Sequence, residues 1–226
     1  MPVISFASSK GGAGKTTSCI VLATELAEGT GVSLIDADPA GRLDRWGRLA
    51  RLPRKLHISR SQGERHIQDE IAEARRRSPF VLVDLEGSAS RMTSFAISES
   101  DLVVVPMGEE QQDAEAAIET LGEVAREARA CRRPIPAVIL LARTNVAVKS
   151  KLERFIASEV RGAARVLETE LHRRTAFSAL HNFGGGLRQL DPAEVNGIDK
   201  AIVNASALAA EIVEVLEEGL VHAAVA

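Results

Sequence analysis

The sequence has no tyrosine and a single tryptophan, and only 3% of its residues are aromatic. Proteins that bind single-stranded nucleic acids stack the bases on aromatic side chains, so we do not expect this class of protein. The two cysteines, Cys19 and Cys131, have no CxxC spacing, and the five histidines form no HExxH motif. The sequence therefore indicates neither a disulfide nor a histidine or cysteine metal site.

Long hydrophobic runs and a leader segment are also missing. No apolar run approaches the length that spans a membrane, and the N-terminus lacks the basic and apolar leader of a secreted protein. We therefore expect a cytoplasmic protein without a membrane partner.

The chain has 226 residues, of which 45% are hydrophobic and 26% charged, and its net charge is −3. This suits one α/β domain over residues 1–226. Short, nearly continuous apolar runs alternate with segments of helical length, which predicts a mostly parallel twisted sheet with helices on both faces. The expected strands are 3–7, 32–36, 80–84, 102–106 and 136–141, with 57–59 at an edge, and the expected helices include 17–28, 63–77 and 111–129.

The most informative segment is residues 8–17, which read Ser-Ser-Lys-Gly-Gly-Ala-Gly-Lys-Thr-Thr. It lies where the first predicted strand turns into a helix. Gly11, Gly12 and Gly14 let the backbone curl around a polyphosphate, and the helix that follows adds the positive end of its dipole. This placement predicts a phosphate-binding loop.

Two lysines and a threonine give this loop its expected chemistry. Lys15 would reach the β and γ phosphates of a nucleotide, and Thr16 would offer its hydroxyl to Mg²⁺. The full pattern G-x-x-x-x-G-K-[ST] needs glycine where this chain has Ser9, and a second lysine, Lys10, begins the loop. The nucleotide contacts that the loop pattern predicts are Gly11, Gly12, Ala13, Gly14, Lys15, Thr16 and Thr17.

Acidic residues follow two of the predicted strands. Asp36 and Asp38 end the second strand, and ligands of parallel sheets bind at the carboxyl ends of the strands. Asp38 could orient an attacking water, and Asp36 could hold a water on Mg²⁺. A simple turn or cap role is the alternative for both residues.

The strand 80–84 has apolar residues followed by Asp84, the Walker B arrangement in which a carboxylate binds the Mg²⁺ shell. Gly87 then allows its amide to approach the γ-phosphate. Glu86 has two readings, either a solvated loop residue or a group that modulates hydrolysis.

Lys10 to Thr17, with its two lysines, resembles the deviant Walker A loop of the ParA/MinD family of dimeric ATPases. In that family the first lysine crosses the dimer interface to the partner's nucleotide, which implies a catalytic role for Lys10 beside Lys15 and Asp38. Residues 36–46 resemble the family's D-x-D-P-Q-G segment, with Ala40 in place of glutamine. This favours the catalytic reading of the two aspartates.

Two later segments extend the resemblance. Residues 106–116 are similar to the family stretch P-x-x-P-S-P-x-D-x-E-A and keep Asp113 and Glu115, although the later prolines are absent. Asn145 follows a strand where family members commonly contact adenine, and an asparagine can pair with an adenine edge. A turn-forming role for Asn145 is the alternative.

The resemblance implies a P-loop NTPase fold, Mg²⁺ and ATP as cofactors, and slow ATP hydrolysis. It further implies an ATP-dependent homodimer that binds double-stranded DNA nonspecifically on the nucleoid and is stimulated by a ParB-like centromere-binding protein. The chain is similar to the short plasmid-partition ATPases without an N-terminal DNA-binding extension, and also to the short ATPase of T-DNA transfer systems.

Other functions of this superfamily are less favoured. A MinD-like membrane role needs a basic terminal helix, but residues 207–221 are acidic. An iron–sulfur reductase needs a cysteine near the Walker B segment, and residues 84–100 contain none. A small-molecule synthetase would not need Lys10. A passive DNA-binding module that merely senses ATP is a further alternative.

Three basic clusters could bind DNA, although most such runs are solvated surfaces. One follows Gly41 with an arginine at every third position, which predicts a basic stripe on one helix. The resemblance favours the two clusters of the C-terminal half. The clusters comprise Arg42, Arg45, Arg48, Arg51, Arg54 and Lys55; Lys149, Lys151, Arg154, Arg161 and Arg165; and Arg173, Arg174 and Arg188.

Overall fold

The computed structural model describes the chain except for residues 89, 147–155, 157, 163 and 226. Its described part contains a seven-stranded sheet in which every strand pair is parallel. The strands are β1 (Val3–Phe6), β2 (Val32–Ala37), β3 (Leu56–Arg60), β4 (Phe80–Leu85), β5 (Leu102–Met107), β6 (Ala137–Thr144) and β7 (Leu171–His172). The sequence-based prediction of a parallel sheet is confirmed.

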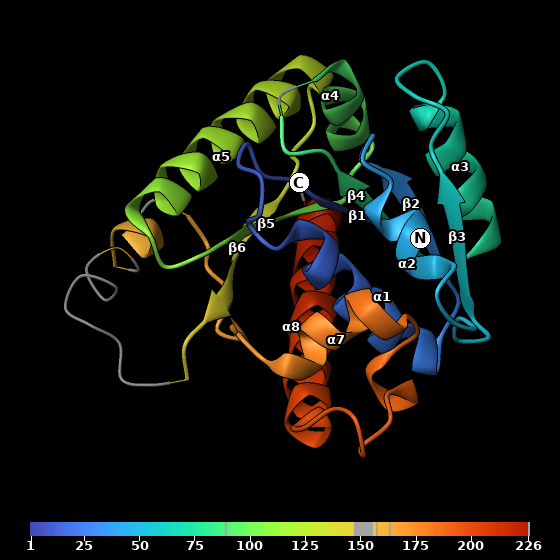
Figure 1. Cartoon of the computed structure of the whole chain (residues 1–226). Coiled ribbons are helices and arrows are strands. Elements are labelled where there is room, and N and C mark those ends of the chain that lie inside the picture. The colour runs from blue at the N-terminus through green and yellow to red at the C-terminus, as the bar shows by residue number, and fades with distance from the viewer. Residues whose placement is uncertain (89, 147–155, 157, 163, 226) are drawn as a thin grey trace.

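The strand order is β3-β2-β4-β1-β5-β6-β7, so β1 is central and β3 is an edge strand, as the sequence predicts. The helices are α1 (Lys15–Gly29), α2 (Arg42–Gly47), α3 (Ile67–Arg77), α4 (Arg91–Ser98), α5 (Gln111–Cys131), α7 (Thr175–Phe183) and α8 (Ile198–Val225). In Figure 1, α3, α4 and α5 lie on one side of the sheet, whereas α1, α7 and α8 lie on the other.

Alternation along β1 shows how the sequence divides the core into two layers. Ile4 and Phe6 belong to the apolar cluster under α1, α7 and α8, whereas Val3 belongs to the cluster under α3, α4 and α5. Successive side chains of a strand point to opposite faces, so a strand buried on both faces has to be apolar at nearly every position. Trp46 of α2, only 1% exposed, joins the first cluster.

The basic cluster after Gly41 departs from the predicted helical stripe. Helix α2 ends at Gly47, because the N–H groups of Arg48 and Leu49 turn back to the carbonyl oxygens of Arg45 and Trp46. Such i to i−3 bonds tighten and end a helix. Arg48, like Arg51 and Arg54 further on, therefore lies beyond the helix rather than on its face.

No helix within the described residues is long and apolar enough to cross a bilayer.

Candidate functional site

The predicted phosphate loop connects β1 to α1 at the carboxyl edge of the sheet. Gly12 and Gly14 have φ angles of 79° and 99°, which L side chains rarely adopt. Gly14 is also the N-cap of α1, and a β-carbon there would lie 3.4 Å from that of Ala142. The glycines thus satisfy the backbone requirement that the sequence predicts.

Lys15 is buried under this loop and folds back along it. Its Nζ donates to the carbonyl oxygen of Lys10 at 3.2 Å and lies 3.5 Å from that of Ser8. Burial lowers the pKa of the Lys15 ammonium, whereas the charges of Asp84 and Asp38 oppose that shift. An ammonium that is held only by carbonyl oxygens and nearby carboxylates can exchange a carbonyl for a phosphate oxygen.

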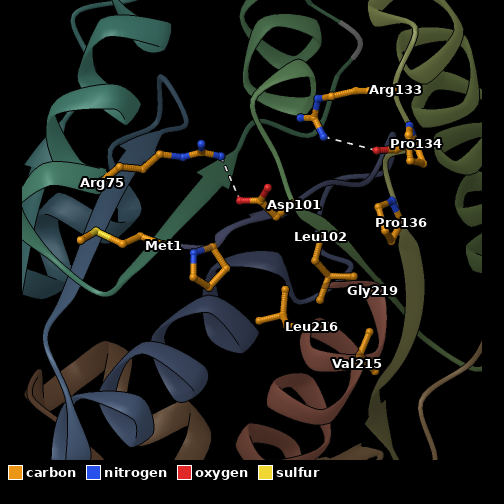
Figure 2. A pocket seen from close by; sticks show the side chains of 11 residues that line it. Met1, Arg75, Asp101, Leu102, Arg133, Pro134, Pro136, Val215, Leu216 and Gly219 are labelled. Carbon is orange, nitrogen blue, oxygen red and sulfur yellow. Dashed lines mark hydrogen bonds and ion pairs between the residues drawn. The ribbon is translucent and has the colours of Figure 1, made fainter. Parts of the chain in front are cut away.

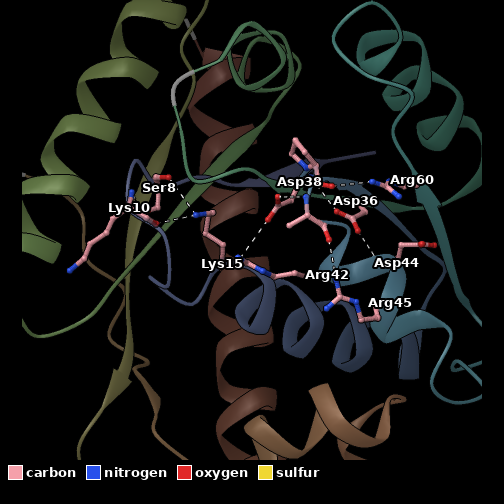
Figure 3. A network of polar contacts seen from close by, with 11 residues as sticks. Ser8, Lys10, Lys15, Asp36, Asp38, Arg42, Asp44, Arg45 and Arg60 are labelled. Atoms are coloured by element: carbon pink, nitrogen blue, oxygen red, sulfur yellow. Dashed lines mark hydrogen bonds and ion pairs between the residues drawn. The ribbon is translucent and has the colours of Figure 1, made fainter.

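Asp36 and Asp38 lie at the end of β2. Both carboxylates accept backbone N–H groups of the segment that follows, as the alternative of a turn or cap role predicts. Asp36 accepts the N–H of Asp38 at 3.2 Å through Oδ1 and the N–H of Asp44 at 2.8 Å through Oδ2. Asp38 accepts the N–H of Ala40, and its other oxygen lies 3.7 Å from Arg42 Nη1. In Figure 3 the side chain of Asp38 lies on the side of Lys15, and Asp36 lies beyond it. Burial raises the pKa of Asp36, while its two backbone donors oppose the shift.

Asp84 ends β4 directly beside Asp36 in the sheet register and is fully buried. Neither of its carboxylate oxygens has a hydrogen-bond partner among the described residues, although the nearby hydroxyl of Thr16 lowers its pKa. Burial is the largest effect and raises the pKa of Asp84 to about 7. A buried carboxylate without a donor is costly unless a cation compensates it.

These oxygen donors fit a magnesium ion that binds together with the phosphates of a nucleotide. Thr16 and Asp84 supply hard oxygen atoms, and Asp36 stands next to them. In the described part of the chain, no group of three or more His, Cys, Asp or Glu side chains converges on a metal position. Mg²⁺ suits such a site because it commonly keeps several waters and binds one or two carboxylates together with substrate phosphates.

The loop after β4 packs against the phosphate loop. A β-carbon on Gly87 would lie 3.2 Å from Lys15 Nζ and 3.3 Å from the backbone nitrogen of Gly11, so a side chain there would crowd the site. The half-buried Glu86 makes no hydrogen bond or ion pair within the described part.

Lys10 leaves the loop in another direction. Its Nζ forms an ion pair with Asp113 Oδ1 of α5 at 2.6 Å, and its side chain points away from Lys15 (Figure 3). The preceding Ser9 donates its N–H to Thr120 Oγ1 and its hydroxyl to the carbonyl oxygen of Ala116. The serine that departs from the standard loop pattern therefore attaches the start of the loop to α5.

A cavity of about 520 Å³ adjoins the phosphate loop. Its walls include Gly14, Thr17, Arg143, Arg173, Phe177 and His181. The structure does not bring Asn145 into this cavity. The N–H of Asn145 donates to Glu109, and Asn145 borders a separate hollow beside the cavity, with His172 lining both.

Arg143 and His181 are site neighbours that sequence reasoning did not single out. Arg143 has a φ angle of 61° and donates through Nη1 to the carbonyl oxygen of Gly12. His181 Nε2 is 2.8 Å from the hydroxyl oxygen of Thr17, and burial, followed by the charge of Arg42, lowers its pKa. The position of Arg143 at the end of a strand could have marked it as a site residue. No local sequence pattern predicts that α7, which carries His181, packs against α1.

A second cavity, of about 400 Å³, lies at the opposite edge of the sheet (Figure 2). Asp101 there accepts the N–H of Val3 and pairs with Arg75 at 2.9 Å. Arg133 donates to the carbonyl oxygens of Ser98 and Ser100. These side chains join the ends of α3, α4 and α5 to the sheet.

Three described arginines of the two clusters in the C-terminal half are paired with acidic side chains, whereas Arg173 and Arg174 line the cavity beside the phosphate loop. Arg161 bonds to Glu168, Arg165 to Glu218, and Arg188 makes a two-fold contact with Glu25. The remaining predicted basic residues of the middle cluster, Lys149, Lys151 and Arg154, lie outside the described residues. The early cluster has fewer such pairs.

Comparison with known sequences agrees with this geometry. The family model of the VirC1 protein matches residues 1–218. A protein named ParA from Rhizobium radiobacter is 38% identical over 222 residues, which cover 97% of this chain and 100% of the relative. A virC1 protein from the same organism is 29% identical over 191 residues, covering 81% of this chain and 82% of that protein.

Solved structures of low sequence identity share the fold. An McdA–ATP complex from Cyanothece is 16% identical with a TM-score of 0.72, covering 97% of this chain and 96% of that chain. MinD of Aquifex aeolicus is 19% identical with a TM-score of 0.67, covering 91% and 95%. From the sequence matches and the shared fold, the chain belongs to the VirC1 family and is a P-loop NTPase of the ParA/MinD type.

Proposed function

We propose that this protein is an ATPase switch that dimerises with ATP, binds double-stranded DNA nonspecifically and drives the partition of plasmid or chromosomal DNA. The relative named ParA, 38% identical over its whole length, supports partition as the process. Relatives named ParA and virC1 favour this reading over a small-molecule synthetase.

ATP binding is assigned to the loop between β1 and α1. Lys15 would exchange its carbonyl partners for the β and γ phosphates, and Gly87 would approach the γ-phosphate through its amide. Thr16, Asp84 and Asp36 would hold Mg²⁺ and its waters, and the ion would supply positive charge to the phosphates. The unpartnered, buried carboxylate of Asp84 supports this assignment. The adjoining cavity has room for the base and ribose, and Asn145, which borders the neighbouring hollow, stays a proposed adenine contact.

Hydrolysis is assigned to Asp38 and the two lysines. Asp38 is half-buried at the edge of the site, and among the described residues its Oδ2 makes only a loose contact with Arg42, so this oxygen is available to orient a water. Orientation of the attacking water lowers the barrier without requiring tighter binding of ATP. We propose slow intrinsic turnover, which a ParB-like DNA-binding partner stimulates.

The observation that carries the dimer proposal is the direction of Lys10. Lys15 serves the phosphates within the chain, whereas Lys10 points away from that site and rests on Asp113. A lysine on the same loop that does not reach its own phosphates has a role if it reaches those of a second copy. There it would offset the repulsion between two polyphosphates that face each other.

Sedimentation with a nonhydrolysable ATP analogue tests this proposal. We expect the wild type to sediment as a dimer, and Lys10→Ala to bind the analogue but remain monomeric and lose most hydrolysis. Lys200→Ala, which removes an exposed lysine of α8, is the matched control. The double variant Lys10→Ala/Asp113→Asn removes the carboxylate that the single change leaves unpaired, and it should also stay monomeric. A wild-type-like dimer with full ATPase activity in either variant contradicts the proposal.

A second candidate function is an accessory ATPase of DNA transfer. The match of the VirC1 family model to residues 1–218 favours it. Competition binding separates the two functions: equal affinity for unrelated duplexes supports partition and nucleoid association, whereas strong preference for a transfer-origin duplex supports transfer.

A further inference from the structure

The charge of this chain is unevenly distributed. The segment 42–55 contains five arginines and one lysine but only one acidic residue, and so has a net charge of +5. Because the whole chain has a net charge of −3, the remaining residues carry −8. A basic segment on an otherwise acidic protein creates a local field that attracts polyanions.

The fold exposes this segment. Helix α2 buries Leu43 and Trp46, which are 0% and 1% exposed, and ends at Gly47, so the next arginines enter a turn and the loop before the edge strand β3. Arg45, Arg48, Arg51 and Arg54 are all exposed, and we name these four residues the α2–β3 basic surface.

Most of this surface is free to bind an anion. Arg48 pairs with Asp44 of α2 while its side chain stays 77% exposed, and within the described residues the Arg45 side chain bonds only to the carbonyl oxygen of Ala40. Arg51 and Arg54 have no side-chain hydrogen bond or ion pair within the described residues. The described arginines 161, 165 and 188 of the later clusters are instead paired with Glu168, Glu218 and Glu25. The other described members of those clusters, Arg173 and Arg174, line the cavity of the proposed nucleotide site.

The composition of the surface favours a phosphodiester backbone over a membrane. One guanidinium group can bind two phosphate oxygens at once, and arginine is the preferred side chain for such contacts. A membrane-binding helix presents a row of apolar residues beside its basic ones. Here the apolar side chains of α2, Leu43 and Trp46, face the core, and Leu49, at 46%, is the one large apolar side chain that the segment 42–55 exposes. Aromatic stacking residues for single strands are also scarce, so duplex DNA is the favoured partner.

The start of this segment is joined to the proposed nucleotide site. Asp36 accepts the N–H of Asp44 within α2, and Asp38 lies 3.7 Å from Arg42 at the start of the helix (Figure 3). On the other side of the turn, Arg60 of β3 donates to the carbonyl oxygen of Pro39. A change in the contacts of either aspartate therefore acts directly on the position of α2.

We propose that the α2–β3 basic surface binds the phosphate backbone of duplex DNA, and that nucleotide contacts at Asp36 and Asp38 set its position through α2. The inference rests on the DNA binding in the proposed function and names the surface responsible. It differs from the expectation that the basic clusters of the C-terminal half bind DNA.

The test compares charge-neutralised variants for binding to a duplex of arbitrary sequence, with a nonhydrolysable ATP analogue and over a series of salt concentrations. We expect the triple variant Arg48→Gln/Arg51→Gln/Arg54→Gln to lose at least tenfold in affinity and to lower the slope of log affinity against log salt by roughly 2 to 3. Its analogue binding and basal ATPase activity should match the wild type.

The control Arg76→Gln/Arg129→Gln/Arg132→Gln removes the same charge near the ends of α3 and α5, and should keep both affinity and slope. A second comparison, Arg161→Gln/Arg165→Gln, examines a later cluster. Wild-type affinity in the first triple variant, an equal loss in the control, or a larger loss in the second comparison overturns the inference. So does binding of the wild type to anionic vesicles but not to duplex DNA, a result that also removes DNA binding from the proposed function.

Discussion

The two edges of the sheet use acidic side chains in different ways. At the amino edge Asp101 accepts a backbone N–H and pairs with Arg75, beside a cavity of about 400 Å³ (Figure 2). At the carboxyl edge, beside a cavity of about 520 Å³, Asp84 is fully buried and has no donor among the described residues. The two cavities are similar in volume, so volume does not distinguish the two edges. The difference is that the buried carboxylate of Asp84 lacks a hydrogen-bond donor, whereas the carboxylate of Asp101 has one. We therefore assign a structural role to the amino edge and a chemical role to the carboxyl edge.

The strongest test of this contrast is Lys15→Ala at the carboxyl edge. We expect ATP affinity to fall by roughly 100-fold or more, because a hydrogen bond to a charged group is worth about 1.5–3 kcal/mol and Lys15 would make more than one. Isothermal titration with ATP and Mg²⁺ measures the change. Retained wild-type affinity would remove Lys15 from the phosphate site.

Asp38→Ala separates binding from turnover at the same edge. Hydrolysis should slow by roughly 100-fold, since a group that positions or activates water contributes about that much, while the affinity for ATP changes little. Single-turnover phosphate release, compared with equilibrium binding, provides the measurement. If phosphate is released at the wild-type rate, the role belongs to another residue, with Asp36 the first candidate.

In the absence of divalent cations, the substitution Asp84→Asn should stabilise the protein. The raised pKa of Asp84, about 7 against an ordinary 3.8, means that the folded state holds a proton that the unfolded state releases between these values. Wild-type stability should therefore fall as pH rises from about 4 to about 7, by up to about 1.4 kcal/mol per pH unit from this group. Urea unfolding in a chelator at several pH values should give a shallower dependence for Asp84→Asn, together with loss of Mg²⁺-dependent hydrolysis. Parallel pH profiles for the two proteins would refute the raised pKa.

Arg75→Ala is the matched change at the amino edge and should have the smallest effect. The free energy of unfolding should fall by about 1 kcal/mol, because the ion pair with Asp101 is partly exposed to solvent. ATP affinity should stay at the wild-type value. A loss of ATP affinity larger than the loss of stability would mean that the amino edge also contributes to the nucleotide site.

The sequence predicted best the features that depend on residues close together in the chain. The loop glycines, Lys15 and the strand-end aspartates follow one another within short motifs, and an acid at the end of a parallel strand has to emerge at the carboxyl edge. The edge position of β3 was equally accessible, since its short run is less apolar than the others. These elements needed no knowledge of distant partners.

What the sequence could not predict depends on contacts between distant segments. Pairing of Arg188 with Glu25, or of Arg165 with Glu218, decides which basic residues remain available, and it joins positions far apart in the chain. The end of α2 depends on a turn that the regular arginine spacing conceals. The left-handed backbone of Arg143 has no sequence signature, because an arginine rarely adopts a positive φ angle and only its surroundings hold it there.

The burial of Trp46 gives this protein an optical property. As the sole tryptophan in a chain without tyrosine, it is the main source of near-ultraviolet absorption and emission. Its indole sits on α2, shielded from solvent, with no hydrogen-bond partner for its N–H within the described residues. The fluorescence emission maximum of the folded protein should therefore lie at short wavelength. It should shift to longer wavelength if α2 moves enough to admit water to the indole. The helix that connects the aspartates to the α2–β3 basic surface thus carries its own fluorophore, and its motion can be followed in real time without attaching a dye.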